Sequence, residues 1–64
     1  MRLVAEFMPP DALRHSAEWL NEHAETLASI PDDAVRIDTG RTEGGAYRRV
    51  WVLEKHAALF RSET

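Results

Sequence analysis

The chain has 64 residues and a mass of 7.3 kDa, which allows one small domain at residues 1–64. It has no cysteine, and this excludes a disulfide framework, a thiolate nucleophile and a cysteine zinc site. With 44% hydrophobic and 30% charged residues, the composition is typical of a globular protein. No apolar run approaches the ~20 residues of a membrane span, and Glu6 interrupts the apolar N-terminal stretch, so a cytoplasmic protein is expected.

The small size also makes the expected stability marginal. Scaling surface with mass predicts that folding buries roughly 6,400 Å², of which about 3,800 Å² is apolar. At ~25 cal/mol per Å² this burial supplies about 96 kcal/mol, and ordering the chain at ~1.5 kcal/mol per residue costs about the same. A homodimer or a protein partner is therefore expected to add to the stability.

The net charge of −3 is unevenly distributed. Residues 1–34 carry two basic and seven acidic side chains, whereas residues 35–64 carry six basic and four acidic ones. This division predicts one acidic and one weakly basic surface, which would steer the approach of a partner. Seven of the eight basic residues are arginine, a usage that fits a GC-rich bacterial genome or one of its phages.

The first element is predicted to be a strand over residues 1–8. Its residues alternate in two sets, Met1, Leu3, Ala5 and Phe7 against Arg2, Val4, Glu6 and Met8. A period of two is typical of a half-buried strand, and the first set is expected to face the core. Pro9 and Pro10 end the strand and suit the first turn of a following helix.

An amphipathic helix is predicted to follow and to stop near Ser29, because Pro31 disfavours helical backbone at Ile30. Its expected apolar stripe is Leu13, Ala17, Leu20, Ala24 and Leu27. His15, Trp19 and His23 are expected to lie on a flank of this stripe. The acidic residues Glu18, Glu22 and Glu25 are expected to form a solvated surface.

A β-hairpin is predicted in the second half of the chain. Val35, Ile37 and Thr39 alternate with Arg36 and Asp38, and a glycine-containing loop at 40–45 precedes the apolar run 50–53. A turn at Glu43-Gly44 places Val35 opposite Val52, Ile37 opposite Val50, Asp38 opposite Arg49 and Arg36 opposite Trp51. A slip of one residue would put charges against the core, but a slip of two stays open.

Together these elements predict an α+β fold, a single β-α-β-β domain. One amphipathic helix packs on a three-stranded mixed sheet, and a short turn or helix ends the chain. The first two strands are parallel, and the third, the most apolar, lies between them. The residues expected to face the helix are Leu3, Ala5, Phe7, Val35, Ile37, Val50 and Val52, a layer that looks complete. The residues expected on the other face are Val4, Met8, Arg36, Asp38, Tyr47, Arg49, Trp51 and Leu53.

This second face combines aromatic, apolar and arginine side chains, which is unusual for a solvated sheet surface. Three interpretations are open. The C-terminal segment around Leu59-Phe60 covers the face, or a protein binds it, either a partner or a second copy. The third is single-stranded nucleic acid, with bases stacking on Tyr47 and Trp51 and arginines such as Arg36, Arg48 and Arg49 meeting phosphates.

The residues of this chain predict no enzyme. His15 and His23 with nearby acids supply too few ligands for a catalytic zinc site, so no metal or cofactor is expected. The loop at 40–45 lacks the G-K-[ST] of a phosphate loop and joins two strands. The sequence therefore predicts a small accessory or inhibitory interaction module. Its expected partner-binding residues are Trp51, Tyr47, Arg49, Arg36 and Leu53, because aromatic and arginine side chains dominate binding hot spots.

Overall fold

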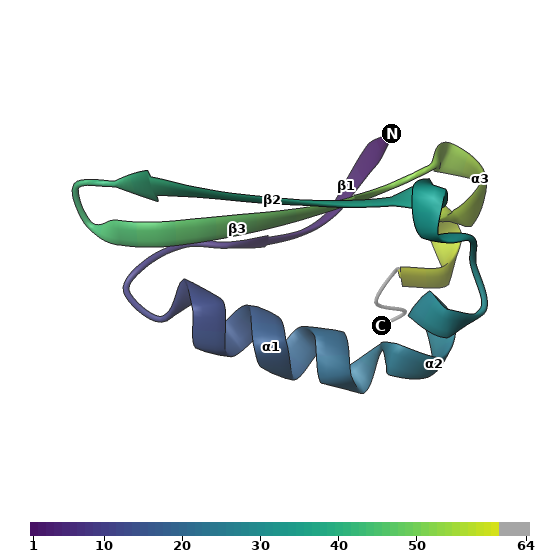
Figure 1. Cartoon of the computed structure of the whole chain (residues 1–64), viewed down its shortest axis with the longest axis horizontal. Coiled ribbons are helices and arrows are strands. Elements are labelled where there is room, and N and C mark those ends of the chain that lie inside the picture. The colour runs from purple at the N-terminus through teal and green to yellow at the C-terminus, as the bar shows by residue number, and fades with distance from the viewer. Residues whose placement is uncertain (61–64) are drawn as a thin grey trace.

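Three strands form one open sheet in the computed structural model, which describes residues 1–60 (Figure 1). They are β1 (Arg2–Phe7), β2 (Val35–Thr42) and β3 (Gly45–Val52), in the order β1-β3-β2. The α+β class and the central third strand are confirmed. Because β3 separates the two parallel strands and pairs antiparallel with both, the sheet is antiparallel and not mixed.

The register of the β2–β3 hairpin is the predicted one. Val35 lies opposite Val52 and Ile37 opposite Val50, and the last pair is Thr42 with Gly45. The turn is therefore Glu43-Gly44, and a slip of two residues does not occur. Gly45 has a φ of 128°, a conformation that side chains other than glycine's rarely adopt.

A β-bulge in β1 changes which residues face the helices. Leu3 pairs with Trp51 and Ala5 with Val50, so Val4 is an extra residue in the strand. Val4 packs against the core, whereas Leu3 shares the opposite face with Trp51 and is 39% exposed. The predicted orientations of Leu3 and Val4 are therefore wrong, because strict alternation does not allow for a bulge.

The predicted single helix is two helices, α1 (Ala12–Glu22) and α2 (Ala24–Ala28). The backbone leaves helical geometry at His23, with φ −104° and ψ 18°. There the His23 ring lies 2.8 Å, through Nδ1, from the Trp19 carbonyl oxygen and competes for it with the backbone N–H. Within the described residues, no helix is long and apolar enough to cross a membrane.

The buried face of α1 is rotated from the predicted one. Ala12 and Ser16 are buried, whereas Leu13 is 46% exposed and Ala17 and Ala24 are also exposed. The predicted stripe is therefore wrong at Leu13, Ala17 and Ala24, whereas its other two members, Leu20 and Leu27, are half-buried. Small side chains at 12 and 16 let α1 approach the sheet closely, and Ser16 accepts a hydrogen bond from the sheet residue Arg48.

The core lies at the end of the sheet near α2. After β3 the chain forms α3 (Glu54–Ala57) and the 3-10 turn η2 (Ala58–Phe60), while η1 (Asp32–Ala34) precedes β2. Phe60 is buried and stacks on Trp19, with ring centroids 5.7 Å apart. The members of the core cluster are Ile30, Val52, Ala57 and Phe60, with Val4, Trp19, Leu27 and Val35 packed against it.

The helical layer does not cover the whole inner face of the sheet. α1 packs chiefly against β3 and β1, and Ile37 on β2 remains 44% exposed. The predicted complete layer is therefore open over β2. In Figure 1 α1, α2 and η2 lie on one side of the sheet, and α3 lies beyond its end.

Candidate functional site: the outer face of the sheet

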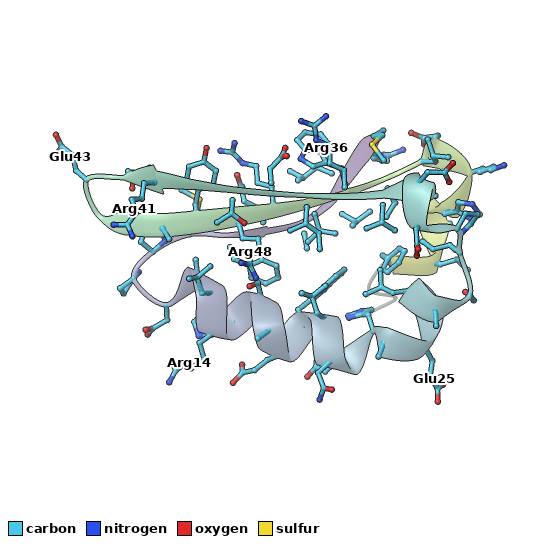
Figure 2. All side chains as sticks on the ribbon, viewed as in Figure 1. Arg14, Glu25, Arg36, Arg41, Glu43 and Arg48 are labelled. Carbon is cyan, nitrogen blue, oxygen red and sulfur yellow. The ribbon has the colours of Figure 1, made fainter. Side chains whose placement is uncertain are left out.

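We call the sheet surface turned away from α1 the outer face. Residues directly opposite one another in an antiparallel sheet share a face, so the strand register defines the members of the outer face. These are Leu3 and Glu6 on β1, Arg36 and Asp38 on β2, and Tyr47, Arg49 and Trp51 on β3. Figure 2 shows Arg36 on this side of the sheet and Arg48 between the sheet and α1.

The central strand supplies a row of three large side chains. The Arg49 guanidinium lies over the Tyr47 ring, 4.7 Å from its centroid. Tyr47 in turn lies across Gly40, its partner on β2, where a Cβ atom would collide with the phenol ring. Glycine at position 40 therefore lets Tyr47 lie flat along the hairpin, where Arg49 stacks on it.

The charges of the outer face are paired with one another. Arg49 Nε donates to Glu6 Oε2 at 2.7 Å, and Arg36 Nε donates to Asp38 Oδ1 at 3.0 Å. The hydrogen bond to Glu6 raises the pKa of Arg49. Two arginines and two carboxylates make the centre of the face amphipathic and close to neutral.

A shallow hollow opens beside Trp51. Met1, Arg36, Asp38 and Trp51 line it, and its volume is about 380 Å³. The Trp51 indole N–H is covered and meets no acceptor among residues 1–60. The hollow therefore has an apolar wall from Met1 and Trp51 and a polar wall from the Arg36–Asp38 pair.

Four of the five predicted binding residues meet on this face, namely Arg36, Tyr47, Arg49 and Trp51. Leu53 follows the end of β3 and is 36% exposed. The sequence prediction missed Met1 and Leu3, which flank Trp51. Residues 3–5 are all apolar, so the sequence gives no sign of the bulge. Period-two alternation alone therefore does not predict that Leu3 lies on the outer face.

Arg48 faces the helix. Its Nε donates to Thr39 Oγ1 and its Nη1 to Ser16 Oγ, both at 3.1 Å. Of the three arginines expected to meet phosphates, Arg48 therefore does not lie on the outer face.

The histidines do not form a site together. His15 is exposed, whereas His23 stacks on Trp19 with ring centroids 4.2 Å apart. His56 is half-buried, and its Nε2 has no partner among residues 1–60. In the same part of the chain, no three histidine or acidic side chains gather closely enough to hold a metal ion.

Comparison with protein-family models, curated proteins and solved structures finds no significant match to this chain.

Proposed function

We propose that this protein is a small, non-enzymatic interaction module that binds a protein partner through the outer face of its sheet. The observation that supports the proposal is the position of the C-terminal segment. Phe60 packs on Trp19 on the helix side of the sheet, and none of the described elements crosses the outer face. Residues 61–64 lie outside the described residues.

The chemistry of the outer face favours a protein partner. Trp51, Leu3 and Met1 offer an apolar surface beside the hollow, and Leu3 and Met1 are 39% and 53% exposed. Arg36 and Arg49 add donors whose charges are already balanced. An apolar centre with aromatic and arginine side chains and a polar border is the usual composition of a binding hot spot.

Single-stranded nucleic acid is the less supported partner. Base stacking on Tyr47 and Trp51 needs phosphate contacts nearby, yet Arg48 points to the helix side. A phosphate would also compete with Glu6 and Asp38 for the two remaining arginines. The cytoplasmic location and the accessory or inhibitory role stay predictions.

The experiment compares two apolar-to-acidic variants used as bait in a host lysate. Leu3→Asp changes the outer face, and the matched control Leu13→Asp changes a similarly exposed position on α1. We expect a specific partner to be captured by the wild type and by Leu13→Asp but lost from Leu3→Asp, with circular dichroism showing that both variants fold.

Trp51→Ala provides a second test at the centre of the face. We expect it to lose the same partner while retaining its helical signal. A partner that both outer-face variants still capture would contradict the proposal.

A further inference from the structure

The inference concerns the free edge of β2. This strand lies at one end of the sheet, and its eight residues pair with β3 without a bulge. The edge of β1, in contrast, is interrupted by the bulge at Val4. Exposed edges invite pairing with another strand, and proteins usually blunt them with charged side chains, bulges or prolines. β2 contains no bulge or proline, and its charged residues carry both signs.

The hydrogen bonds and the register of the hairpin show which backbone groups of β2 face away from β3. Leu53 N donates to Ala34 O at 3.0 Å, so the pair 34–53 is hydrogen-bonded across the hairpin. Hydrogen-bonded and non-hydrogen-bonded pairs alternate along an antiparallel ladder. Arg36 and Asp38 therefore direct their backbone groups to β3, whereas Val35, Ile37 and Thr39 direct theirs outward.

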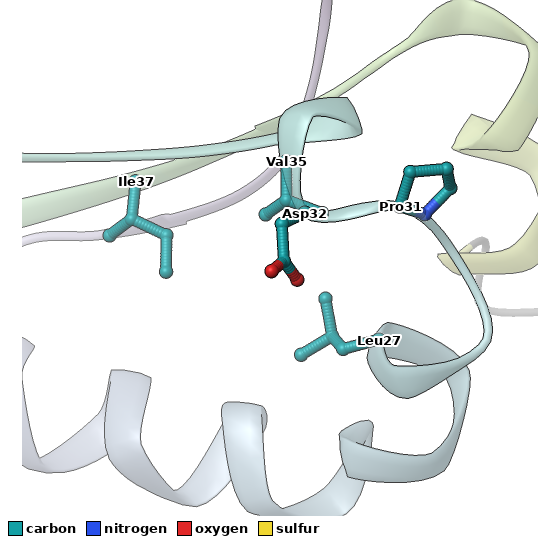
Figure 3. Close-up of a pocket in the computed structure, with 5 residues that line it drawn as sticks. All are labelled: Leu27, Pro31, Asp32, Val35 and Ile37. Atoms are coloured by element: carbon teal, nitrogen blue, oxygen red, sulfur yellow. The ribbon is translucent and has the colours of Figure 1, made fainter.

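The inner face beside this edge is apolar and open. Val35 and Ile37 point from β2 toward the helices, and Leu27 rises from α2 to meet them (Figure 3). With Pro31 and Asp32 these side chains line a cavity of about 430 Å³. Pairing along β2 would cover Ile37, which is 44% exposed in the single chain.

We propose that the partner of this edge is a second copy of the chain, with the two β2 strands antiparallel and Ile37 opposite Ile37 of the second copy. Ile37 then exchanges both backbone hydrogen bonds with its counterpart. Arg36 lies opposite Asp38 of the second copy, in a non-hydrogen-bonded pair where side chains come closest.

Charge complementarity selects this register. The two charged residues of β2 that flank Ile37 are Arg36 and Asp38, and they carry opposite signs. Each charge therefore meets its opposite across the two-fold axis. Shifting the pairing by two residues in one direction sets Arg36 against itself, and in the other direction sets Asp38 against itself.

The two-fold axis of this dimer passes through the sheet, so both copies keep their helices on the same side. α1 packs chiefly against β3 and β1, which leaves room beside β2 for the second copy. Two three-stranded sheets become one continuous sheet with two outer faces side by side. The inference does not depend on what the outer face binds.

The test uses charge reversal and mixing. Arg36→Asp and Asp38→Arg each place like charges opposite one another in the homodimer, and we expect each to raise the dimer dissociation constant roughly tenfold or more. An equimolar mixture restores complementarity at both pairs, because one copy then carries two acids and the other two bases. We expect this mixture to recover the wild-type dissociation constant in sedimentation equilibrium.

A matched control separates register from overall charge. Glu25→Arg gives α2 the same change in net charge as Asp38→Arg but lies away from the edge. Glu25→Arg keeps the wild-type edge and should dimerise with itself, but in a mixture it should not bring Arg36→Asp into dimers as Asp38→Arg does. In hydrogen exchange, the amides of Val35, Ile37 and Thr39 should become protected as the wild type dimerises. The proposal would be overturned by a wild type that is monomeric at all concentrations. It would also be overturned by a dimer whose dissociation constant is unchanged by both charge reversals.

Discussion

At the scale of single residues, the most informative contact joins Arg48 to Ser16. Arg48 is half-buried between the sheet and α1, and its guanidinium meets no carboxylate among residues 1–60. It depends on the hydroxyls of Ser16 and Thr39, and Ser16 Oγ also donates to the Leu13 carbonyl at 2.9 Å. The hydroxyl of the buried Ser16 thus provides the acceptor that allows the Arg48 guanidinium to lie under the helix.

Ser16→Ala should lower the free energy of unfolding by about 1 kcal/mol, because Arg48 loses an acceptor while the helix gains a little intrinsic propensity. For a domain of this size, that loss lowers Tm by roughly 4–8 °C. The matched control is Ser29→Ala, since Ser29 is exposed and bonds only the nearby Thr26 carbonyl. Thermal unfolding followed by circular dichroism measures both. Equal losses in the two variants would show that Ser16 does not support Arg48.

At the scale of elements, the alternation of β2 and β3 predicted the hairpin and excluded a one-residue slip, because such a slip would bury charge. It did not exclude a two-residue slip. The face of α1 was not predictable in the same way. Two faces are available for packing, one through Leu13 and Leu20 and one through Ala12, Ser16 and Trp19. The apolar periodicity favours the first face, but α1 packs through the second, where the small residues Ala12 and Ser16 are buried against the sheet.

The candidate site was predictable to the same extent as the strands that carry it. Tyr47, Arg49 and Trp51 follow from the period of β3 alone. Met1 and Leu3 join them only because of the bulge at Val4, and a bulge depends on how two strands fit together. The position of Phe60 on the helix side of the sheet depends likewise on a long-range contact, its stacking on Trp19.

The C-terminal segment provides the prediction at this scale. Phe60→Ala should lower the free energy of unfolding by about 3–5 kcal/mol, because it removes a buried ring stacked on Trp19. Its neighbour Leu59 is 55% exposed, so Leu59→Ala should change the free energy by less than about 1 kcal/mol. Urea unfolding followed by tryptophan fluorescence distinguishes them. A mild effect at Phe60 would mean that this segment does not hold the core together.

At the scale of the whole molecule, the near balance of burial and ordering leaves the single chain only marginally stable. The structure shows two surfaces where further burial is available. The outer face suits another protein, and the β2 edge with Ile37 suits a second copy. The two surfaces adjoin at Arg36 and Asp38, which belong to both.

Dimerisation through β2 should therefore appear in the stability of the whole molecule. Mass action stabilises any state that associates only when folded, so Tm of the wild type should rise by several degrees over a ~100-fold increase in protein concentration. Arg36→Asp should show a smaller rise, because its copies repel one another at the two-fold axis. Differential scanning calorimetry over a dilution series measures both slopes. A wild-type Tm that is independent of concentration would mean that the single chain is stable enough on its own, with Ile37 open to water.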